Sequence, residues 1–210
     1  MTKTEEYWKE TFRKCDAWWV HNGTPTMPHA LYTKGGHAAG YFNSQVVQGA
    51  VLREATEDLL ETARTLLAAT HVQHVFGPRE GAVPLVKACG SILKVPCVFT
   101  KQVEEGGQKS TLIETGQNLH GQTVLPFEDT ISTARTIQEA ISALEEMGAI
   151  VLPLICALVN RLGEDQVGGR KIVALVNEKT TIWAQDECPL CPESKALRPK
   201  PNWHLFMPDA

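Results

Sequence analysis

The residues with the clearest chemical pattern lie between Val124 and Thr136. An apolar run ending at Phe127 leads into two adjacent acids, Glu128 and Asp129, and then into a short segment rich in hydroxyl side chains. Backbone N–H groups at a helix N-terminus favour an anion, especially a phosphate, and the two acids could accept hydrogen bonds from a ribose diol beside it. The segment therefore predicts a sugar-phosphate site. The alternative is a capped helix start with solvated acids.

Apolar strands and amphipathic helices alternate around this segment and would have to position it. The expected helices cover residues 51–67, 82–93 and about 132–147, the last of them stopped by Gly148. The expected strands cover residues 71–76, 95–99, 124–127, 150–159 and 171–176. This alternation indicates an α/β fold, with a mainly parallel twisted sheet flanked by helices. Ligands of such sheets bind at the carboxyl ends of the strands, where the two acids stand.

The chain is expected to form a single domain over residues 1–210. Residues 1–48 would form a small N-terminal hood segment, whose first twenty residues are predicted as an amphipathic helix rich in aromatic side chains. Residues 49–180 would form the α/β core, in which the polar segment 100–121 is predicted as a long loop or hairpin. Residues 181–210, which contain several prolines and two cysteines, are predicted as an irregular tail lying on the surface.

Composition limits the classes of protein to which the chain can belong. With 43% hydrophobic and 21% charged residues, it has ordinary globular composition rather than that of a disordered or fibrous chain. A net charge of −4 without a basic stretch argues against a nucleic-acid partner. The longest uncharged apolar run, residues 149–159, is too short to cross a bilayer, and the acidic start lacks the apolar stretch of a signal peptide. We therefore expect a cytoplasmic protein with no membrane partner.

One pair of cysteines, Cys188 and Cys191, has the spacing of metal ligands. A zinc site generally needs four ligands, and the sequence holds no second pair of comparable spacing. His204 is a possible third ligand. The sequence favours a structural pair of thiols, and a zinc site is the alternative.

Residues 124–136 resemble the phosphoribosyl pyrophosphate (PRPP) motif of the type I phosphoribosyltransferases, in which an apolar strand leads to two acids and a Thr/Gly-rich loop. In this chain Ala134 stands where the family usually has Gly, and Arg135 stands where a small residue is usual. The resemblance makes Asp129 a candidate catalytic residue. It implies that PRPP is bound by Glu128, Asp129, Thr130, Ser132, Thr133, Ala134, Arg135 and Thr136.

Other segments resemble one branch of that family, the orotate phosphoribosyltransferases. Residues 32–43 look like its base-binding segment, residues 76–84 like its pyrophosphate loop, and residues 158–163 like the strand end whose Arg contacts the orotate carboxylate. The Cys pair with the later Arg-Pro-Lys is similar to the tail of some bacterial members. The implied base-binding residues are Lys34, Tyr41, Phe42 and Arg161, and the implied pyrophosphate-loop residues are Pro78, Arg79 and Gly81.

Structural roles are the alternatives for the base-binding residues. Tyr41 and Phe42 would then belong to a hydrophobic core, because isolated aromatic residues more often do. Arg161 would form a surface ion pair with Glu164 or Asp165.

The resemblance also implies a mobile loop that covers the leaving pyrophosphate with cationic side chains. Residues 100–110 occupy that region, where Lys101 and Lys109 are the candidate catalytic cations and Glu104 and Glu105 would oppose an anion. In the base-binding segment, Gly36, Ala38 and Ala39 stand where the family commonly has basic or polar residues. These departures together leave two possibilities: an enzyme that uses a different base, or a chain that has kept the fold and lost turnover.

Transfer of ribose 5-phosphate from PRPP to a base, most naturally orotate, is the activity that the resemblance implies. Mg²⁺ would be held through the substrate, the small-molecule partners would be PRPP and a nucleobase, and the enzyme would be a homodimer, as family members generally are. One alternative is a non-catalytic PRPP- or nucleotide-binding regulatory protein, favoured by Arg135 and the few cations in residues 100–110. Another is an interaction protein that binds no sugar phosphate, favoured by the aromatic first helix and the Cys pair.

Overall fold

The computed structural model describes residues 2–33, 35–67, 70–79, 81–105 and 108–207, and the side chains among them except those within residues 102–111. Two compact units make up the fold. Unit 1 comprises Met1–Glu5 and Gln48–Glu178, and unit 2 comprises Glu6–Val47 and Lys179–Ala210. Unit 2 therefore combines most of the expected hood segment with the C-terminal segment.

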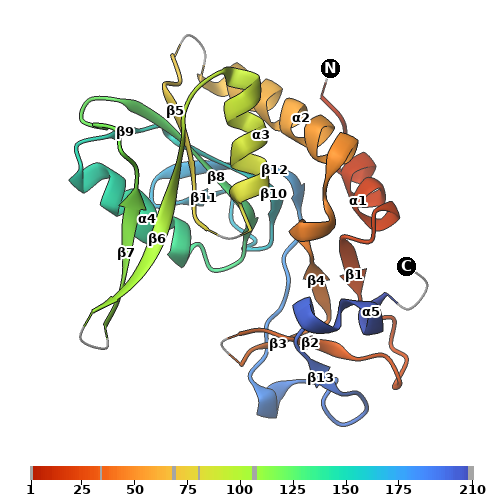
Figure 1. The fold of residues 1–210 in the computed structure, drawn as a ribbon. Coiled ribbons are helices and arrows are strands. Elements are labelled where there is room, and N and C mark those ends of the chain that lie inside the picture. Colours follow the sequence, from red (N-terminus) through yellow and green to blue (C-terminus); the bar gives the residue numbers. More distant parts are fainter. Residues whose placement is uncertain (1, 34, 68–69, 80, 106–107, 208–210) are drawn as a thin grey trace. The chain divides into compact units, whose positions relative to one another are not determined.

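An eight-stranded sheet forms the centre of unit 1, with the strand order β11-β12-β10-β8-β5-β6-β7 and β9 paired to β8 (Figure 1). The strands are β5 (His74–Gly77), β6 (Cys97–Glu105), β7 (Gln108–Glu114), β8 (Thr123–Ile131), β9 (Ile150–Val151), β10 (Leu154–Asn160), β11 (Gln166–Val167) and β12 (Arg170–Asn177). Pairing is parallel from β12 through β10, β8 and β5 to β6, and antiparallel at the β11 and β7 edges. The prediction of a mainly parallel α/β sheet is confirmed.

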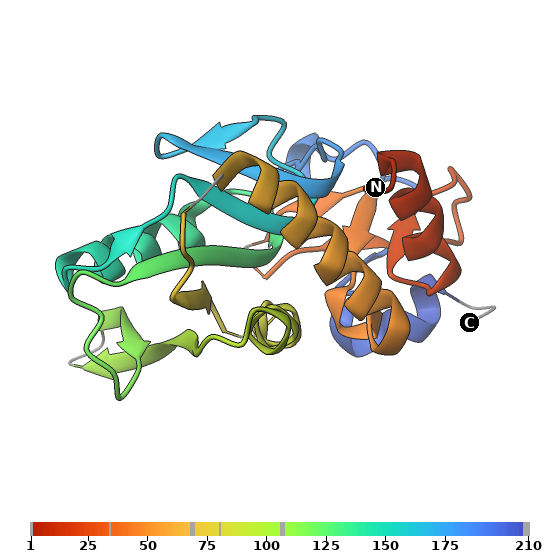
Figure 2. The same cartoon turned by 90° about the horizontal axis from the view of Figure 1, so that it is seen from above.

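Three helices pack on this sheet: α2 (Gly49–Leu67), α3 (Val83–Leu93) and α4 (Arg135–Glu146). Figures 1 and 2 show α2 and α3 side by side, as their contacts require. The connections β5-α3-β6 and β8-α4-β10 cross the sheet in opposite directions, so right-handed crossovers place α3 and α4 on opposite faces. None of the described helices is both long and apolar enough to span a membrane.

Helix α4 shows how the sequence pattern fixes this packing. Ile137, Ala140, Ile141 and Leu144 recur at helical spacing and are buried in the main hydrophobic core, so one face of the helix covers the sheet. Gly148 follows in the left-handed conformation, with a φ of 79°, which glycine adopts without a steric penalty. The predicted helix stop is confirmed, and the chain turns directly from α4 into β9.

Unit 2 consists of short elements from both ends of the chain. They are α1 (Glu5–Lys14), β1 (Trp18–Val20), β2 (His29–Leu31), β3 (His37–Ala38), β4 (Gly40–Phe42), η1 (Ser44–Val46), η2 (Gln185–Glu187), β13 (Ala196–Leu197), η3 (Lys200–Asn202) and α5 (Trp203–Phe206). Strands β1 and β4 form one small sheet, and β13, β2 and β3 form another. The C-terminal segment is therefore tied to the N-terminal segment by strand pairing, since β13 lies parallel to β2.

The first helix is shorter than the sequence predicts. It ends at Lys14, Asp16 turns the chain in the left-handed conformation with a φ of 57°, and Trp18 and Trp19 lie in β1. Strand β1 pairs with β4, and the Trp18 ring lies 5.8 Å from that of Phe42. The prediction of one helix over twenty residues is wrong because pairing and ring packing outweigh the helical pattern of these aromatics.

Several strand bounds also differ from the prediction; β5, for example, begins at His74 rather than at residue 71. The expected strand 150–159 is divided into β9 and β10 at Leu152 and Pro153, because proline has no N–H to donate to a ladder. Strand β8 continues past Phe127 to Ile131 through its pairing with β10. The polar segment after residue 100 forms the β6–β7 hairpin, one of the two forms expected for it.

Candidate active site

Three neighbouring parallel strands of unit 1 end at one edge of the sheet. Strand β5 ends at Gly77, β8 at Ile131 and β10 at Asn160. The backbone N–H of Arg161 donates to the Ile131 carbonyl at 2.7 Å, which joins the ends of β10 and β8. The residues predicted for PRPP, for pyrophosphate and for the base carboxylate therefore come from one edge. This is the edge at which open α/β sheets bind ligands.

The two acids lie in the last part of β8, not in the loop that follows it. Burial raises the pKa of Glu128 well above its usual range, and the neighbouring Asp129 carboxylate raises it further. A Glu128 carboxyl oxygen also accepts the backbone N–H of Asp129 at 3.2 Å. The pair thus combines one buried acid that tends to keep its proton with a second acid that is only half-buried.

Replacing Glu128 with glutamine is expected to raise the free energy of unfolding relative to wild type, and this difference should grow as pH rises. The folded pKa of Glu128 lies above the unfolded value of about 4.3, so the folded state binds the proton more tightly and wild-type stability falls as pH rises through that window. Glutamine does not titrate and escapes this loss. Urea unfolding of both proteins between acid and neutral pH measures the difference, with Glu146→Gln on the exposed side of α4 as control. A difference independent of pH would contradict the prediction.

The Asp129 carboxylate reaches the loop that follows β5. A Cβ atom added to Gly81 would lie 2.2 Å from Asp129 Oδ2 and 2.7 Å from Oδ1. No side chain fits there unless the carboxylate moves, so the close approach depends on glycine. The predicted pyrophosphate loop and the predicted ribose acid are therefore in direct contact.

Arg79, the cation of that loop, is held against the neighbouring strands. Its backbone N–H donates to Thr100 Oγ1 at 3.1 Å, and its guanidinium lies 2.5 Å from the Glu114 carboxylate. The guanidinium carbon also lies 5.9 Å from the centre of the Phe99 ring. An incoming pyrophosphate would compete with Glu114 for this half-exposed cation.

The loop between β8 and α4 carries the predicted phosphate ligands. Ala134, at the position where the family usually has Gly, adopts the left-handed conformation with a φ of 55°, and such a conformation costs a non-glycine residue about 1 kcal/mol. Arg135 pairs with Glu139 one turn along the helix at 2.6 Å. This ion pair holds the guanidinium on the exposed side of α4. Within the same segment, Ser132 is half-buried, and Thr133 and Thr136 are exposed.

Thr130, just before this loop, has a side-chain oxygen that is buried and finds no hydrogen-bond partner among the described residues. A buried hydroxyl without a partner is costly, so such groups are usually satisfied by something. At a strand end beside a helix N-terminus, an anionic oxygen of a ligand is well suited to that role.

The structure describes the side chains of only some of the remaining predicted cations. Arg161 has only 5% of its surface exposed, so it is buried and does not lie on the surface. Lys101 is exposed on β6, and the backbone of Lys109 lies in β7, but the Lys109 side chain is outside the described part of the structure. Lys34 also lies outside the described residues.

The two aromatic candidates for base binding belong to β4 of unit 2. Phe42 is buried, and its ring centre lies 5.0 Å from that of Phe12 and 5.8 Å from that of Trp18. Tyr41 is half-buried, with its ring centre 5.8 Å from that of Trp203. Phe42 is therefore part of a hydrophobic core, which was the alternative to base binding. Tyr41 keeps an exposed part that a planar base could contact.

The Cys188 and Cys191 pair also lies in unit 2, where it meets His29 and His37. His204, the possible third ligand, is exposed on α5 and outside this cluster. Sequence spacing did not reveal the two partners, because the histidines are eight residues apart and more than 150 residues from the cysteines.

Residues 48–189 match the family described as the phosphoribosyl transferase domain. The chain belongs to this family. This phosphoribosyltransferase-family chain is 28% identical over 179 residues to the orotate phosphoribosyltransferase of Desulforamulus reducens, a match that covers 84% of the chain and 90% of the relative. It is 30% identical over 169 residues to the orotate phosphoribosyltransferase of Caldicellulosiruptor saccharolyticus, which covers 79% of the chain and 83% of the relative. The resemblance inferred from the motifs is confirmed.

Solved structures share the phosphoribosyltransferase fold of this chain. The orotate phosphoribosyltransferase of Aeropyrum pernix matches with a TM-score of 0.64 and 19% identity, over 80% of this chain and 92% of the other. An adenine phosphoribosyltransferase of Trypanosoma brucei, solved with AMP, pyrophosphate and ribose-5-phosphate, matches with a TM-score of 0.61 and 14% identity, over 81% and 79%. At these identities the likeness establishes the fold.

Proposed function

We propose that the chain is a phosphoribosyltransferase that transfers the ribose 5-phosphate of PRPP to orotate and releases pyrophosphate. The observation that carries the proposal is the contact between the Asp129 carboxylate and Gly81 at the carboxyl edge of the sheet. It puts a ribose-binding acid beside a loop suited to pyrophosphate. The relatives named orotate phosphoribosyltransferase support orotate as the base.

The 5′-phosphate would lie at the N-terminus of α4. That helix has 12 residues, so its first N–H groups carry the positive end of a full helix dipole. The Thr130 hydroxyl, without a partner among the described residues, would contact a phosphate oxygen. Ser132 and the backbone through Thr136 would supply further donors. The ribose hydroxyls would then reach Glu128 and Asp129 at the end of β8.

The reaction would break the bond between the anomeric carbon and pyrophosphate, which leaves with the bonding electron pair. A ring nitrogen of the base would supply the pair for the new bond, through a cation-like sugar. Catalysis would come chiefly from positioning and from stabilising the charge of the leaving group. Arg79, Lys101 and Lys109 are the cations proposed for that charge, and Arg161 would hold the carboxylate of the base.

The donor set at the strand ends suits Mg²⁺. The side chains there offer carboxylate and hydroxyl oxygens, which a hard cation prefers, and Mg²⁺ normally takes few protein ligands together with substrate oxygens and water. Asp129 is the protein ligand we propose, since its carboxylate is only half-buried and lies against the Gly81 loop. The ion would neutralise charge on the pyrophosphate.

Small molecules would be the only substrates of this enzyme. The proposal places it in the cytoplasm as a homodimer, like the family that its motifs resemble.

A second candidate function is a PRPP-binding regulatory protein without turnover. The Arg135–Glu139 ion pair favours it, because the guanidinium at the start of α4 is already engaged by a carboxylate.

Pyrophosphate release from PRPP and Mg²⁺ tests these functions, first with orotate and then with a panel of other purine and pyrimidine bases. Release with orotate supports the proposal. Release only with a base other than orotate would mean that Arg161 does not serve to hold an orotate carboxylate. Absence of release in protein that PRPP stabilises against heat would support the regulatory protein, since a ligand of the folded state must raise stability. Absence of both effects would support an interaction protein.

A further inference from the structure

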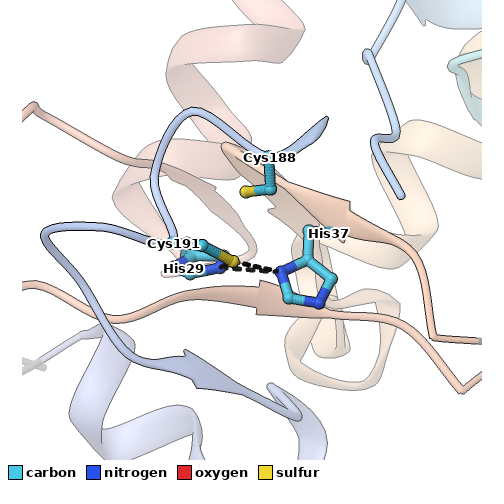
Figure 3. Close-up of side chains that lie close together, drawn as sticks. All are labelled: His29, His37, Cys188 and Cys191. Atoms are coloured by element: carbon cyan, nitrogen blue, oxygen red, sulfur yellow. Dashed lines mark hydrogen bonds between the residues drawn. The ribbon is translucent and has the colours of Figure 1, made fainter. Parts of the chain in front are cut away.

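Four side chains with metal-binding donors converge in unit 2 (Figure 3). His29 begins β2, His37 begins β3, and Cys188 and Cys191 come from the turn that follows η2. One donor atom from each of them lies within 4.8 Å of all the others. Two thiolates and two imidazoles are a donor set typical of structural zinc.

The distances between donors are close to those around a single zinc ion. His29 Nε2 lies 2.9 Å from His37 Nδ1, and Cys191 Sγ lies 3.2 Å from His37 Nδ1 and 3.6 Å from His29 Nε2. Zinc bonds of about 2.0–2.1 Å to nitrogen and 2.3 Å to sulfur place tetrahedral ligand atoms roughly 3.3–3.8 Å apart. Small side-chain movements would therefore complete the site.

Backbone pairing brings the two histidines to this place. Strands β2 and β3 are antiparallel, with Leu31 opposite His37, and β13 aligns Ala196 with His29. Trp183 forms a bridge with His37, through two backbone hydrogen bonds of 2.9 Å. The chain on both sides of the cysteine turn is thus anchored to the strands that carry the histidines.

A hydrogen-bond chain orients the His29 ring. Ser194 Oγ donates to the Leu190 carbonyl at 3.2 Å and lies 2.7 Å from His29 Nδ1. When the Ser194 hydroxyl donates to Leu190, its oxygen accepts the Nδ1 proton of His29, and the lone pair of His29 Nε2 is then directed into the cluster. Such a second partner is typical of metal-bound histidine.

We propose that His29, His37, Cys188 and Cys191 bind one structural zinc ion. Three of the four are nearly buried, with exposures of 0% for His29, 4% for His37 and 5% for Cys188. Four protein ligands close the coordination sphere, so the ion would take no substrate and would act on folding. It would join chain segments 162 residues apart, between His29 and Cys191, and hold unit 2 together.

Zinc titration of the full, reduced and metal-depleted chain tests the proposal, with a chromophoric chelator as competitor and metal analysis for stoichiometry. Wild type should take up one zinc ion and melt at a higher temperature with it. Cys191→Ser and His37→Gln should lose both effects, and Ser194→Ala should bind about 10- to 100-fold more weakly. The matched controls are Cys15→Ser, another half-buried thiol of unit 2, and His204→Gln; both should behave as wild type.

Equal zinc uptake by Cys191→Ser and wild type would overturn the proposal, as would the absence of uptake by the folded wild type. Where a ligand variant fails to fold, the Co²⁺ spectrum of the wild type decides. Intense thiolate-to-cobalt bands of a tetrahedral site support the proposal, and a spectrum of oxygen coordination overturns it. No readout depends on turnover, so the outcome is independent of the proposed transferase activity.

Discussion

Replacing Asp129 with asparagine is expected to abolish pyrophosphate release while leaving the fold intact. Asparagine has the same shape but loses the negative charge, and its side chain replaces one acceptor oxygen with a donor. The ribose hydroxyls and Mg²⁺ would lose the ligand that places the anomeric carbon against the leaving group. Misplacement of about 1 Å costs roughly 100-fold in rate, so we expect kcat/KM to fall by at least about that factor.

Gly81→Ala should cause the same loss by a different route. Its Cβ would occupy the space 2.2 Å from Asp129 Oδ2, so the carboxylate must move although its charge is unchanged. Glu146→Gln, which changes an exposed carboxylate of α4, is the control and should keep full activity. Steady-state pyrophosphate release and urea unfolding of each protein provide the measurements. Full activity in Asp129→Asn would remove Asp129 from the site.

The α/β core could be predicted from sequence because its elements carry local signals. Helix α4 has apolar residues at helical spacing and Gly148 after its last turn, and both features act within a few residues. The strands are short apolar runs bounded by polar or Gly/Pro segments. The acid pair can be predicted for the same reason, because the strand end, the two acids and the hydroxyl residues follow one another directly in the sequence.

Features that depend on contacts between distant residues could not be predicted. Strand β8 extends into the polar residues because Glu128 and Thr130 pair with Ala157 and Val159 of β10, which a local pattern does not contain. The contact of Gly81 with Asp129 arises where two strand ends meet.

The histidine–cysteine cluster is the clearest case of this limit. Cysteine spacing indicated a possible metal site and suggested His204, the histidine nearest in sequence. The histidines that the fold brings to the pair, His29 and His37, come from the other end of the chain, because β13 pairs with β2. Strand pairing within unit 2, and not sequence distance, selects the donors.

Removing the guanidinium of Arg161 is expected to erase a preference for orotate over uracil, which lacks the carboxylate. Arg161 follows β10 beside the end of β8, and only 5% of it is exposed, so an ion pair with a bound carboxylate would be shielded from water. We expect Arg161→Gln to lower kcat/KM for orotate by about 30- to 5,000-fold, because loss of one partner of a buried charge pair costs about 2–5 kcal/mol. The value for uracil should change much less.

The ratio of kcat/KM for orotate to that for uracil is the decisive measurement, because a general loss of folding or of PRPP binding lowers both values and leaves the ratio unchanged. Arg161→Lys serves as the matched variant. It keeps the positive charge but cannot form two parallel hydrogen bonds, so its ratio should fall between those of wild type and Arg161→Gln. Urea unfolding shows whether each variant is folded under assay conditions. A wild-type ratio in folded Arg161→Gln would mean that another residue holds the carboxylate, and that the match at the end of β10 does not extend to base recognition.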